Sequence, residues 1–421
     1  MHVIVVGAGI VGLASAYWLA RDGHAVTVID RETEVGRGAS YANGAQLSYS
    51  YVAPMASPSV LRSLPKWLLR GDSPVRFAPG HSPAQWRWLL HFLRACNAER
   101  SALTTAQLLA LAFSSRDSLH AMMAEAPLEF RHARNGKLVI QSSREGMAEA
   151  ARQVALQAAF GCEQHVLGAA ECLDLEPGLA SIAHRLAGGV YTPSEEVGDC
   201  RMLCEGLRSV LQAPPYQVAF RLGTEVRGFP RNGRRIEAVR TASALLEGDL
   251  VVLASGAQSA SLARAAGVSV AVQPVRGYSV TARVRAGNRA PVRSITDSAR
   301  KTVYAPLGET LRVAGFAEIG GRAAPDKRAD SLLRDLDTLF PGLCELTEAA
   351  PWSGLRPLTP TGLPLIGATL VDNLFVNVGQ GALGFTLAAG SGRLLADLIA
   401  GRTPSVPPEP YAPRRALQGR Q

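Results

Sequence analysis

Three glycines near the start of the chain have the types and spacing of a phosphate-binding turn. Gly7, Gly9 and Gly12 follow an apolar run at residues 2–6 that predicts a buried strand, and a helical pattern covers residues 11–22. Gly7 permits a tight turn, Gly9 allows a pyrophosphate to approach the backbone, and Gly12 allows the helix to pack closely on the sheet. The N-terminus of that helix offers free N–H groups and a positive dipole, so the turn is predicted to bind phosphate.

An acidic residue closes the next predicted strand. Residues 25–29 form a second β-rich run that ends at Asp30, where a carboxylate can accept hydrogen bonds from both hydroxyls of an adenosine ribose. Arg31 follows, but an acid at the strand end argues against a 2′-phosphate, so Arg31 is interpreted as a solvated side chain beside the site. Strand, turn, helix, strand and acid occur in order, which favours dinucleotide binding over a structural turn. The motif alone does not separate FAD from NAD.

Three later segments repeat this use of glycine and small side chains. Residues 36–46 form a loop that can bring more backbone N–H groups to a large cofactor, and residues 249–256 form a predicted strand with a small-residue end. Residues 373–378 form another strand, and a second glycine turn at 379–384 opens a predicted helix over 385–399. The N-terminus of this helix can stabilise negative charge on a reduced flavin ring. The alternative to cofactor binding is that residues 36–46 form an ordinary surface loop and that the glycine turns have only a packing role.

The order of these motifs resembles the D-amino-acid oxidase superfamily of FAD-dependent amine oxidoreductases, and within it the bacterial D-amino-acid dehydrogenases. The motifs that carry the resemblance are GAGIVG at 7–12 with Asp30, SYANGAQLS at 40–48, DLVVLASGA at 249–257, GLRP at 354–357 and VGQGALGFT at 378–386. The resemblance extends from about residue 2 to about residue 402.

The resemblance implies tight, non-covalent FAD binding through residues of these motifs. The implied cofactor residues are Gly7, Ala8, Gly9, Ile10, Val11, Gly12, Asp30, Arg31, Ser40, Ala42, Asn43, Gln46, Leu47, Val226, Ser255, Gly256, Gly379, Gln380, Gly381, Leu383, Gly384, Phe385 and Thr386. The chain departs from the family pattern at Gln380, where many relatives have His, at Phe385, where they have Trp, and at Thr361, where Asp is common. These departures concern substrate range more than fold.

A buried arginine is the expected partner of a substrate carboxylate. Arg356 lies in the GLRP motif, and its planar guanidinium suits a carboxylate better than a point charge does. The structural alternative is an ion pair with an acid of the protein. By the same resemblance, Tyr304 and Arg276 are candidates for a hydroxyl and a second cation in the pocket, although packing or a solvated strand face explains them equally well.

The reaction implied by the resemblance is oxidative deamination of D-amino acids. A hydride passes from Cα to flavin N5, the neutral amine supports the developing imine, and water releases a 2-oxo acid and ammonia. The electrons would then pass to a quinone-type acceptor of a respiratory chain. The alternatives are a flavoenzyme for secondary amines such as sarcosine, glycine or proline derivatives, an NAD-dependent dehydrogenase, and a tRNA-modifying flavin oxidoreductase.

The segment at residues 51–100 has an unusual composition. It holds three of the five Trp, at 67, 86 and 88, together with six Arg and one Lys. Trp, Leu and Arg together are typical of a membrane interface and equally of helices packed on the protein's own core. We therefore expect a cytoplasmic protein, with peripheral contact at the inner membrane through this segment as the alternative to core packing.

The composition excludes several other classes. The chain has 421 residues, 47% of them hydrophobic and 19% charged, which excludes general disorder and a coiled coil. Of the 44 basic residues 40 are Arg, and they are scattered, so the net charge of +9 does not predict nucleic-acid binding. The six Cys form no CxxC pair and no ligand pattern with His, so we expect reduced thiols and no metal site. There is no signal peptide pattern and no run of 18 apolar residues.

These patterns predict an α/β protein of two interleaved domains. A Rossmann-like FAD-binding domain is expected from residues 1–50, 196–270 and 351–402. It would be interrupted by an α+β substrate domain with a mainly antiparallel sheet, from residues 51–195 and 271–350. Residues 403–421 are rich in Pro and Arg and are expected to form an extended or mobile tail.

Overall fold

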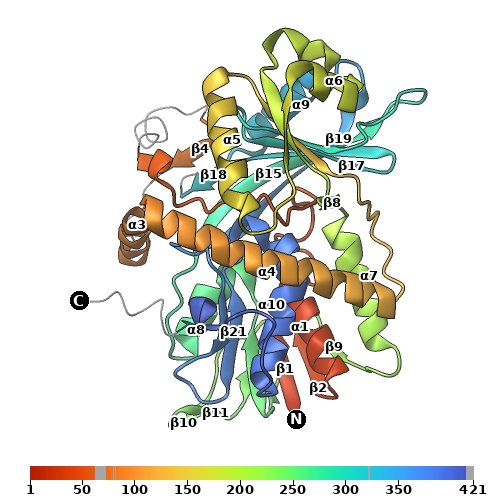
Figure 1. Ribbon diagram of the computed structural model, residues 1–421. Helices are drawn as coiled ribbons and strands as arrows, with labels where there is room; N and C mark the ends of the chain where they lie inside the picture. The colour runs from red at the N-terminus through yellow and green to blue at the C-terminus, as the bar shows by residue number, and fades with distance from the viewer. Residues whose placement is uncertain (62–72, 79, 81, 321–322, 414–421) are drawn as a thin grey trace.

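Two sheets organise the chain, one above the other in the computed structural model (Figure 1). The structure describes residues 1–61, 73–78, 80, 82–320 and 323–413. The lower sheet has six strands and holds the N-terminal strand, and the upper sheet has nine strands. The long helix α4 (Ala98–Glu125) crosses in front of the lower sheet in this view.

The six-stranded sheet follows from short, continuously apolar strands. Its order is β20 (Leu365–Ala368), β21 (Leu374–Val378), β14 (Leu250–Leu253), β1 (His2–Val6), β2 (Ala25–Ile29) and β9 (Ala219–Arg221). All neighbouring pairs are parallel except β20 with β21. Val and Ile dominate β1 because helices and loops cover both of its faces.

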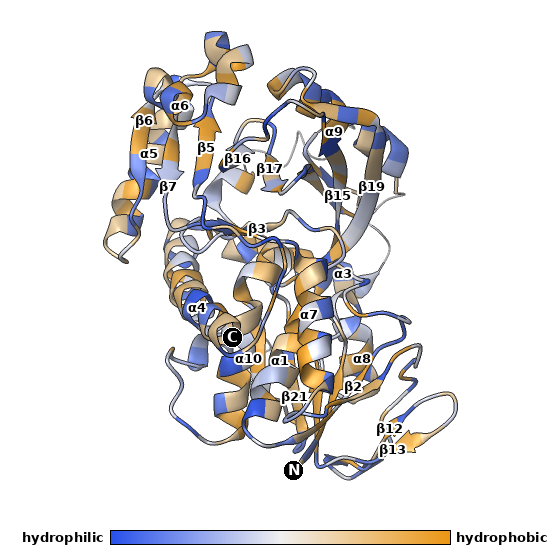
Figure 2. Ribbon diagram, turned by 90° about the vertical axis from the view of Figure 1, so that its right-hand side faces the viewer, coloured by the Kyte–Doolittle hydropathy of each residue, from blue (hydrophilic) through white to orange (hydrophobic). Residues whose placement is uncertain are grey.

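Helices α1 (Ile10–Arg21), α10 (Gly384–Ile399), α4 and α7 (Cys200–Gln212) bury one face of this sheet (Figure 2). By length and hydropathy alone, Gly381–Ile399 would suffice to cross a membrane. However, α10 packs between α1 and α4 so closely that a Cβ on Gly390 would lie 2.7 Å from the backbone nitrogen of Ser115. We therefore assign α10 to the protein core.

The nine-stranded sheet is mainly antiparallel, with parallel pairs only between β16 and β5 and between β18 and β4. Its order is β19 (Cys344–Leu358), β15 (Gln273–Val284), β18 (Thr310–Ile319), β17 (Thr302–Leu307), β16 (Ser294–Asp297), β5 (Lys137–Gln141), β7 (Gly188–Thr192) and β6 (His165–Gly168), with β4 (Val75–Phe77) beside β18. The boundary expected at residue 351 is wrong, because it falls inside the long strand β19.

Smaller elements complete the chain. Helices α9 (Pro325–Leu339), α6 (Ala169–Leu175) and α5 (Arg144–Ala158) lie beside the nine-stranded sheet. Helix α3 (Pro83–Ala95) lies at the lower edge of that sheet, and α8 (Ser259–Ala265) lies beside the six-stranded sheet. Two-residue strands pair as β3 (Gln46–Leu47) with β8 (Glu196–Val197), β10 (Arg231–Asn232) with β11 (Arg235–Ile236), and β12 (Val239–Arg240) with β13 (Leu245–Leu246). The β3–β8 ribbon lies between the two sheets (Figure 2).

Residues 403–413, part of the segment expected to form an extended or mobile tail, pack on the rest of the chain. Val406 and Tyr411 are buried in the same apolar cluster as α1 and α10. The hydroxyl of Tyr411 donates a hydrogen bond to the carbonyl oxygen of Gln107 on α4 at 2.7 Å. Tyr411 ends a short 3-10 helix (Glu409–Tyr411), and burial of its ring with a satisfied hydroxyl holds this segment on the core.

The Trp-rich segment divides between core and surface. On α3, Trp88 is buried and stacks on Phe92, whereas Trp86 and Leu90 are exposed. Trp67 lies outside the described residues. Helix α3 therefore packs one face on the core and leaves an apolar pair on the other.

Candidate functional site

A cavity of about 800 Å³ lies where the two sheets face each other, with residues of β1, of β2 and of the loop after β14 on one side and of β15, β18 and β19 on the other. Segments about 370 residues apart in sequence meet at its wall. The implied cofactor residues that line it are Gly7, Gly9, Ile10, Val11, Asp30, Arg31, Ser40, Ala42, Asn43, Gln46, Val226, Ser255, Gly256, Gln380, Gly381, Leu383, Gly384, Phe385 and Thr386. Ala8, Gly12, Leu47 and Gly379 stand just behind this wall.

The first glycine turn has the tight geometry that its sequence predicts. Gly7 has a φ of +121°, and a Cβ there would lie 2.4 Å from the carbonyl oxygen of Ala254. A Cβ on Gly12 would lie 1.9 Å from the carbonyl oxygen of Gly7, so only glycine allows α1 to begin there. A Cβ on Gly9 would meet only the hydroxyl of Ser40, at 3.4 Å. Gly9 therefore leaves the backbone open to a ligand in the cavity.

Asp30 closes the turn and keeps free acceptor capacity. One oxygen of its carboxylate accepts from the backbone N–H of Ala8 at 2.7 Å, and the other accepts from that of Glu32 at 2.9 Å. Each carboxylate oxygen has a second lone pair, which can accept from a hydroxyl in the cavity. Arg31 is half exposed and pairs with Glu32 at 3.2 Å, as expected for a solvated residue at the edge of the site.

The second glycine turn brings the N-terminus of α10 to the cavity. Gly379 and Gly381 have φ values of +86° and +60°, and a Cβ on Gly379 would lie 2.4 Å from Cγ2 of Thr359. The hydroxyl of Thr386, in the first turn of α10, accepts a hydrogen bond from the backbone N–H of Ser48 at 3.0 Å. The loop after β3 is thereby fixed against the positive end of the α10 dipole.

Arg356 faces the cavity from β19. Its Nη1 donates to the carbonyl oxygen of Phe316 at 2.7 Å, and Gly277 makes room for it, since a Cβ there would lie 2.4 Å from the guanidinium carbon. Phe316 itself has a φ of +62°, a strained conformation for a bulky residue. Burial lowers the pKa of Arg356 to about 10. Among the described residues no carboxylate lies within ion-pair distance of this guanidinium.

Tyr304 and Arg276, the other two substrate candidates, do not line the cavity. The ring of Tyr304 packs edge-on against Phe340 inside the core of the nine-stranded sheet, 5.9 Å between centroids. Tyr278 contributes to the cavity wall, but its ring packs in the apolar core of the nine-stranded sheet. Tyr278 donates its hydroxyl there to Glu318 at 2.6 Å.

Lys137 and Tyr51 line the cavity, and the sequence analysis did not name either as a site residue. Lys137 begins β5, is 2% exposed, and donates from Nζ to the hydroxyl oxygen of Ser48 at 2.9 Å. Its Nζ also lies 4.1 Å from the centroid of the Tyr51 ring, which forms part of the cavity wall. Burial lowers the pKa of Lys137 to about 8 despite the opposing charge of Glu195. A lysine at the start of an apolar strand was the available signal.

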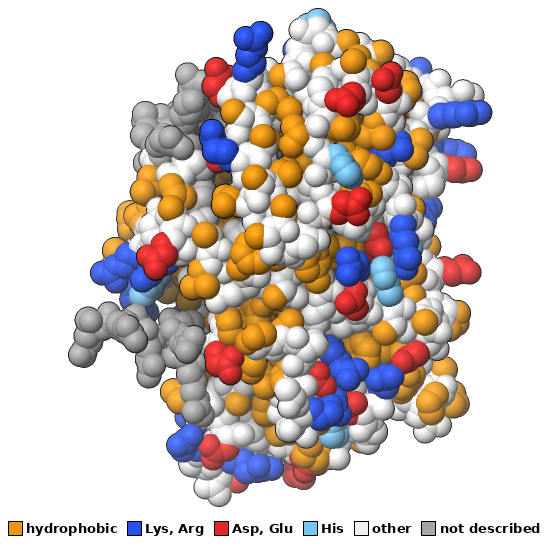
Figure 3. Space-filling view, in the orientation of Figure 1, with side chains coloured by type: hydrophobic (Ala, Val, Ile, Leu, Met, Phe, Trp, Pro, Cys, Tyr) orange, Lys and Arg blue, Asp and Glu red, His pale blue; other side chains and the backbone are white. Residues whose placement is uncertain are grey.

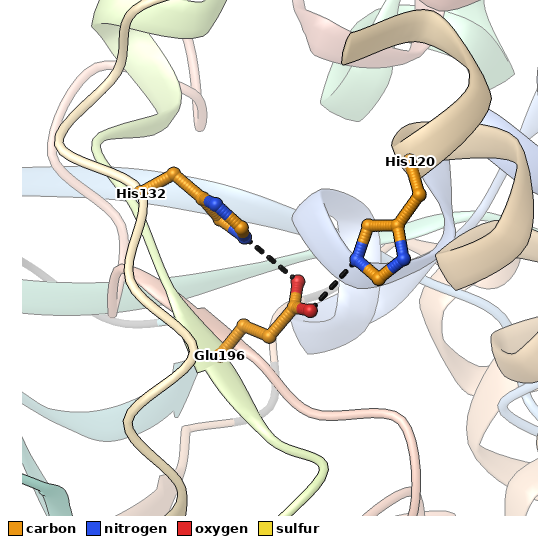
Figure 4. A group of neighbouring side chains, drawn as sticks. All are labelled: His120, His132 and Glu196. Carbon is orange, nitrogen blue, oxygen red and sulfur yellow. Dashed lines mark hydrogen bonds and ion pairs between the residues drawn. The ribbon is translucent and has the colours of Figure 1, made fainter. Parts of the chain in front are cut away.

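A buried carboxylate behind the site binds two imidazoles (Figure 4). Nε2 of His120, on α4, lies 2.7 Å from one oxygen of Glu196, and Nε2 of His132 lies 2.9 Å from the other. The hydroxyl of Tyr49 donates to the second oxygen at 3.0 Å, and Nε of Arg134 lies 3.4 Å from the first. Each oxygen thus already has two neighbouring donor groups. We interpret the cluster as an ion-pair hub and not as a metal site.

The pKa of Glu196 follows from this hub. Burial alone raises the pKa of Glu196, but the hydrogen bond from His132 and the positive potential of the two imidazoles bring it below its ordinary value. A carboxyl whose pKa is lowered by folding stabilises the folded state above its unfolded pKa, and the stabilisation disappears as the pH falls through the folded pKa.

Comparison with known proteins gives consistent results. The family model described as DAO, FAD dependent oxidoreductase, matches residues 2–398. A protein of Ralstonia nicotianae named D-amino acid dehydrogenase 2 is 48% identical over 98% of this chain and 99% of its own length. A protein of Pseudomonas aeruginosa with the same name is 44% identical over 99% of both chains.

Solved structures share the fold at lower sequence identity. The glycine oxidase of Geobacillus kaustophilus superposes with a TM-score of 0.77 at 23% identity, covering 98% of this chain and 97% of that one. The L-proline dehydrogenase of P. horikoshii superposes with a TM-score of 0.77 at 18% identity, covering 99% and 98%. At these identities the likeness concerns the fold.

The hub yields a pH-dependent prediction. Glu196→Gln should lower the free energy of unfolding by about 1–3 kcal/mol at neutral pH, because it removes a buried charge that accepts four donors. The difference from the parent should shrink as the pH falls below the ordinary range of a glutamate, measured by urea unfolding across pH. Glu163→Gln is the matched control, since Glu163 pairs with His165 on the surface. A deficit that persists unchanged in acid would contradict the hub.

Proposed function

This chain belongs to the DAO family of FAD dependent oxidoreductases, and from that premise we propose that it oxidises D-amino acids to 2-oxo acids and ammonia. The observation that carries the proposal is Arg356, a partly buried guanidinium that faces the cavity without a carboxylate partner among the described residues. The names of the curated relatives support the same substrate class.

The residues of the cavity fit a bound FAD. Asp30 has acceptor capacity for the ribose hydroxyls, and Gly9 leaves the backbone at the start of α1 open to a pyrophosphate. The N-terminus of α10 lies at another part of the same wall, where its dipole suits the redox ring. When bound, FAD supplies the acceptor for the two electrons and the hydride that leave the substrate.

The chain's own residues would bind and orient the amino acid. Arg356 holds the substrate carboxylate through its planar fork, and the carbonyl of Phe316 fixes the guanidinium so that little orientation is lost on binding. With the carboxylate fixed, fewer orientations of the Cα–H bond remain, which favours hydride transfer. A neutral substrate amine provides the electron pair for the imine, so no strong base is assigned, and water hydrolyses the imine after release.

Anaerobic bleaching of the bound flavin tests the proposed function directly. Mixed with a panel of D- and L-amino acids and secondary amines, the oxidised FAD absorbance should disappear fastest with primary D-amino acids, the substrate class in the names of the relatives at 48% and 44% identity. Bleaching confined to sarcosine or proline derivatives would instead support a secondary-amine enzyme. Bleaching by no amino acid or secondary amine in the panel would contradict the proposal.

Changing Arg356 tests the carboxylate site. Arg356→Ala should lower kcat/KM for D-amino acids by about a hundredfold or more, close to 3 kcal/mol of binding in the transition state, while FAD content stays full. Arg356→Lys should recover little, because a point charge cannot replace the fork. Arg264→Lys, on the exposed face of α8, is the control. Equal efficiency of parent and Ala variant on every carboxylated substrate would remove Arg356 from the site.

We further propose a quinone-type electron acceptor and contact with the cytoplasmic face of a membrane. The curated relatives are named dehydrogenases, and all six cysteines are free thiols, which suits a reducing compartment. The exposed face of α3 carries Trp86 and Leu90 beside Arg87 and Arg94, and basic and apolar side chains reach the surface there, at the left of Figure 3. Elsewhere on the face shown, basic and acidic side chains are mixed.

Vesicle sedimentation tests the membrane contact. The protein should sediment with vesicles that contain anionic phosphatidylglycerol at low salt and dissociate as salt rises, because arginines attract the lipid and the aromatic and aliphatic side chains insert. The double variant Trp86→Ser with Leu90→Ser should lose most of this binding, whereas Leu156→Ser, at an exposed apolar position on α5, should not. Failure of the parent protein to sediment would contradict the proposal.

A further inference from the structure

Lys137 is an unusual choice of residue in this chain. Only four of the 44 basic residues are Lys, and Lys137 is 2% exposed. Burying an ammonium costs free energy unless nearby groups compensate it. An arginine would hold its proton at any physiological pH, whereas a buried lysine can release and recover one. A lysine at this buried position therefore indicates that release and uptake of the Nζ proton has a function.

The position of Lys137 joins it to the α10 end of the cavity. Its Nζ donates to the hydroxyl oxygen of Ser48 at 2.9 Å, and the backbone N–H of Ser48 donates to the hydroxyl of Thr386 at 3.0 Å. Thr386 lies in the first turn of α10, whose N-terminus carries a partial positive charge. The ammonium and the helix dipole therefore act on the same part of the cavity, and their potentials add.

The neighbours of Lys137 leave its charge only partly compensated. Glu195 is fully buried and accepts from the backbone N–H of Ser50 at 2.7 Å, but its second oxygen has no hydrogen-bond partner among the described residues. Among the described residues, the carboxylate of Glu195 and Nζ of Lys137 are too far apart to form a direct ion pair, although the charge of Glu195 acts on Lys137. Tyr51, which is 42% exposed, and the buried Cys162 are further titratable groups on this side, and burial raises the pKa of Cys162.

We propose that Lys137, held by Ser48, sets the reduction potential of the bound FAD and takes up a proton when that FAD is reduced. The proposal rests on FAD binding in this cavity with its redox ring at the α10 end. Two electrons enter the cofactor from the reductant, and the added negative charge raises the affinity of Nζ for a proton, which comes from solvent. The N–H bond at Nζ is the bond that forms on the protein. Release of this proton accompanies reoxidation by the acceptor.

The pH dependence follows from where Lys137 titrates. Because burial lowers the pKa of Lys137 to about 8, the ammonium is charged at neutral pH in both redox states and favours reduction there. Above that pH the oxidised protein has a neutral Lys137, and reduction must draw a proton to it. One further proton per two electrons then lowers the equilibrium constant for reduction by about tenfold per pH unit, or about 30 mV.

The experiment measures the midpoint potential of FAD in the holoenzyme against redox dyes, with dithionite as reductant, from about pH 6 to about pH 10. Lys137→Met should lower the equilibrium constant for reduction by about tenfold or more at neutral pH, or about 30 mV, and abolish the additional slope above pH 8. Lys137→Arg should keep the neutral-pH potential and lose only the slope, because Arg stays charged. Lys327→Met, on the exposed face of α9, is the control and should match the parent.

The outcomes separate this proposal from a structural role and from the proposed function. An unchanged potential and slope in Lys137→Met with full FAD content would overturn it, and so would retention of the slope in Lys137→Arg. If the Met variant fails to fold, the slope of the Arg variant decides alone. The reductant is not an amino acid, so failure of D-amino acids to bleach the flavin leaves this result unaffected.

Discussion

The contact between the start of α1 and the turn before it holds the nucleotide end of the cavity in place. A Cβ at Gly12 would overlap the carbonyl oxygen of Gly7, so the helix approaches β1 and β14 as closely as a backbone can. On its other side α1 meets α10, where Trp18 donates its indole N–H to the carbonyl oxygen of Ala389 at 3.0 Å. A Cβ on Gly392 would lie 2.8 Å from the carbonyl carbon of Ala14. Two glycine turns from opposite ends of the chain are thus fixed relative to each other by one helix pair.

The opposite wall of the cavity depends on an irregularity in the antiparallel sheet. The register of β15 against β18 shifts between Arg276 and Tyr278, and Phe316 adopts its left-handed conformation opposite this point. The shift directs the carbonyl of Phe316 at Arg356. A β-bulge is a common means of re-aiming one group without disturbing the strands around it. Strain at Phe316 is therefore the cost of presenting a guanidinium to the cavity.

Much of the nucleotide side could be predicted from the sequence because its signals are local. The first turn, Asp30 and the second turn each lie within a short stretch whose spacing has one physical explanation. The substrate side could not be predicted in the same way, because the face of a strand depends on register with neighbours far away in sequence. Tyr304 and Arg276 have suitable chemistry, yet neither lines the cavity, and the ring of Tyr304 lies in the core of the nine-stranded sheet. The same limit concealed Lys137 until β5 was placed beside β16.

The hub of His120, His132 and Glu196 illustrates a further limit. Its members come from a helix, a loop and a two-residue strand, and no spacing in the sequence connects them. The domain boundary expected at residue 351 and the tail expected from residue 403 illustrate the same limit. Composition there indicated a boundary and a loose end, whereas tertiary packing extends β19 and buries Tyr411.

Two adjacent carboxylates in this structure communicate with different surroundings. Glu195 points toward Ser50 and the enclosed side of Lys137, while Glu196 points the other way, toward imidazoles that are partly open to water. Adjacent positions of an extended chain face opposite ways, so the start of β8 presents its two carboxylates to two different electrostatic environments. One carboxylate is neutralised by side chains near the surface, and the other contributes to the potential felt by the cavity lysine. A segment two residues long thus links the surface charge of the protein to the charge balance beside its cavity.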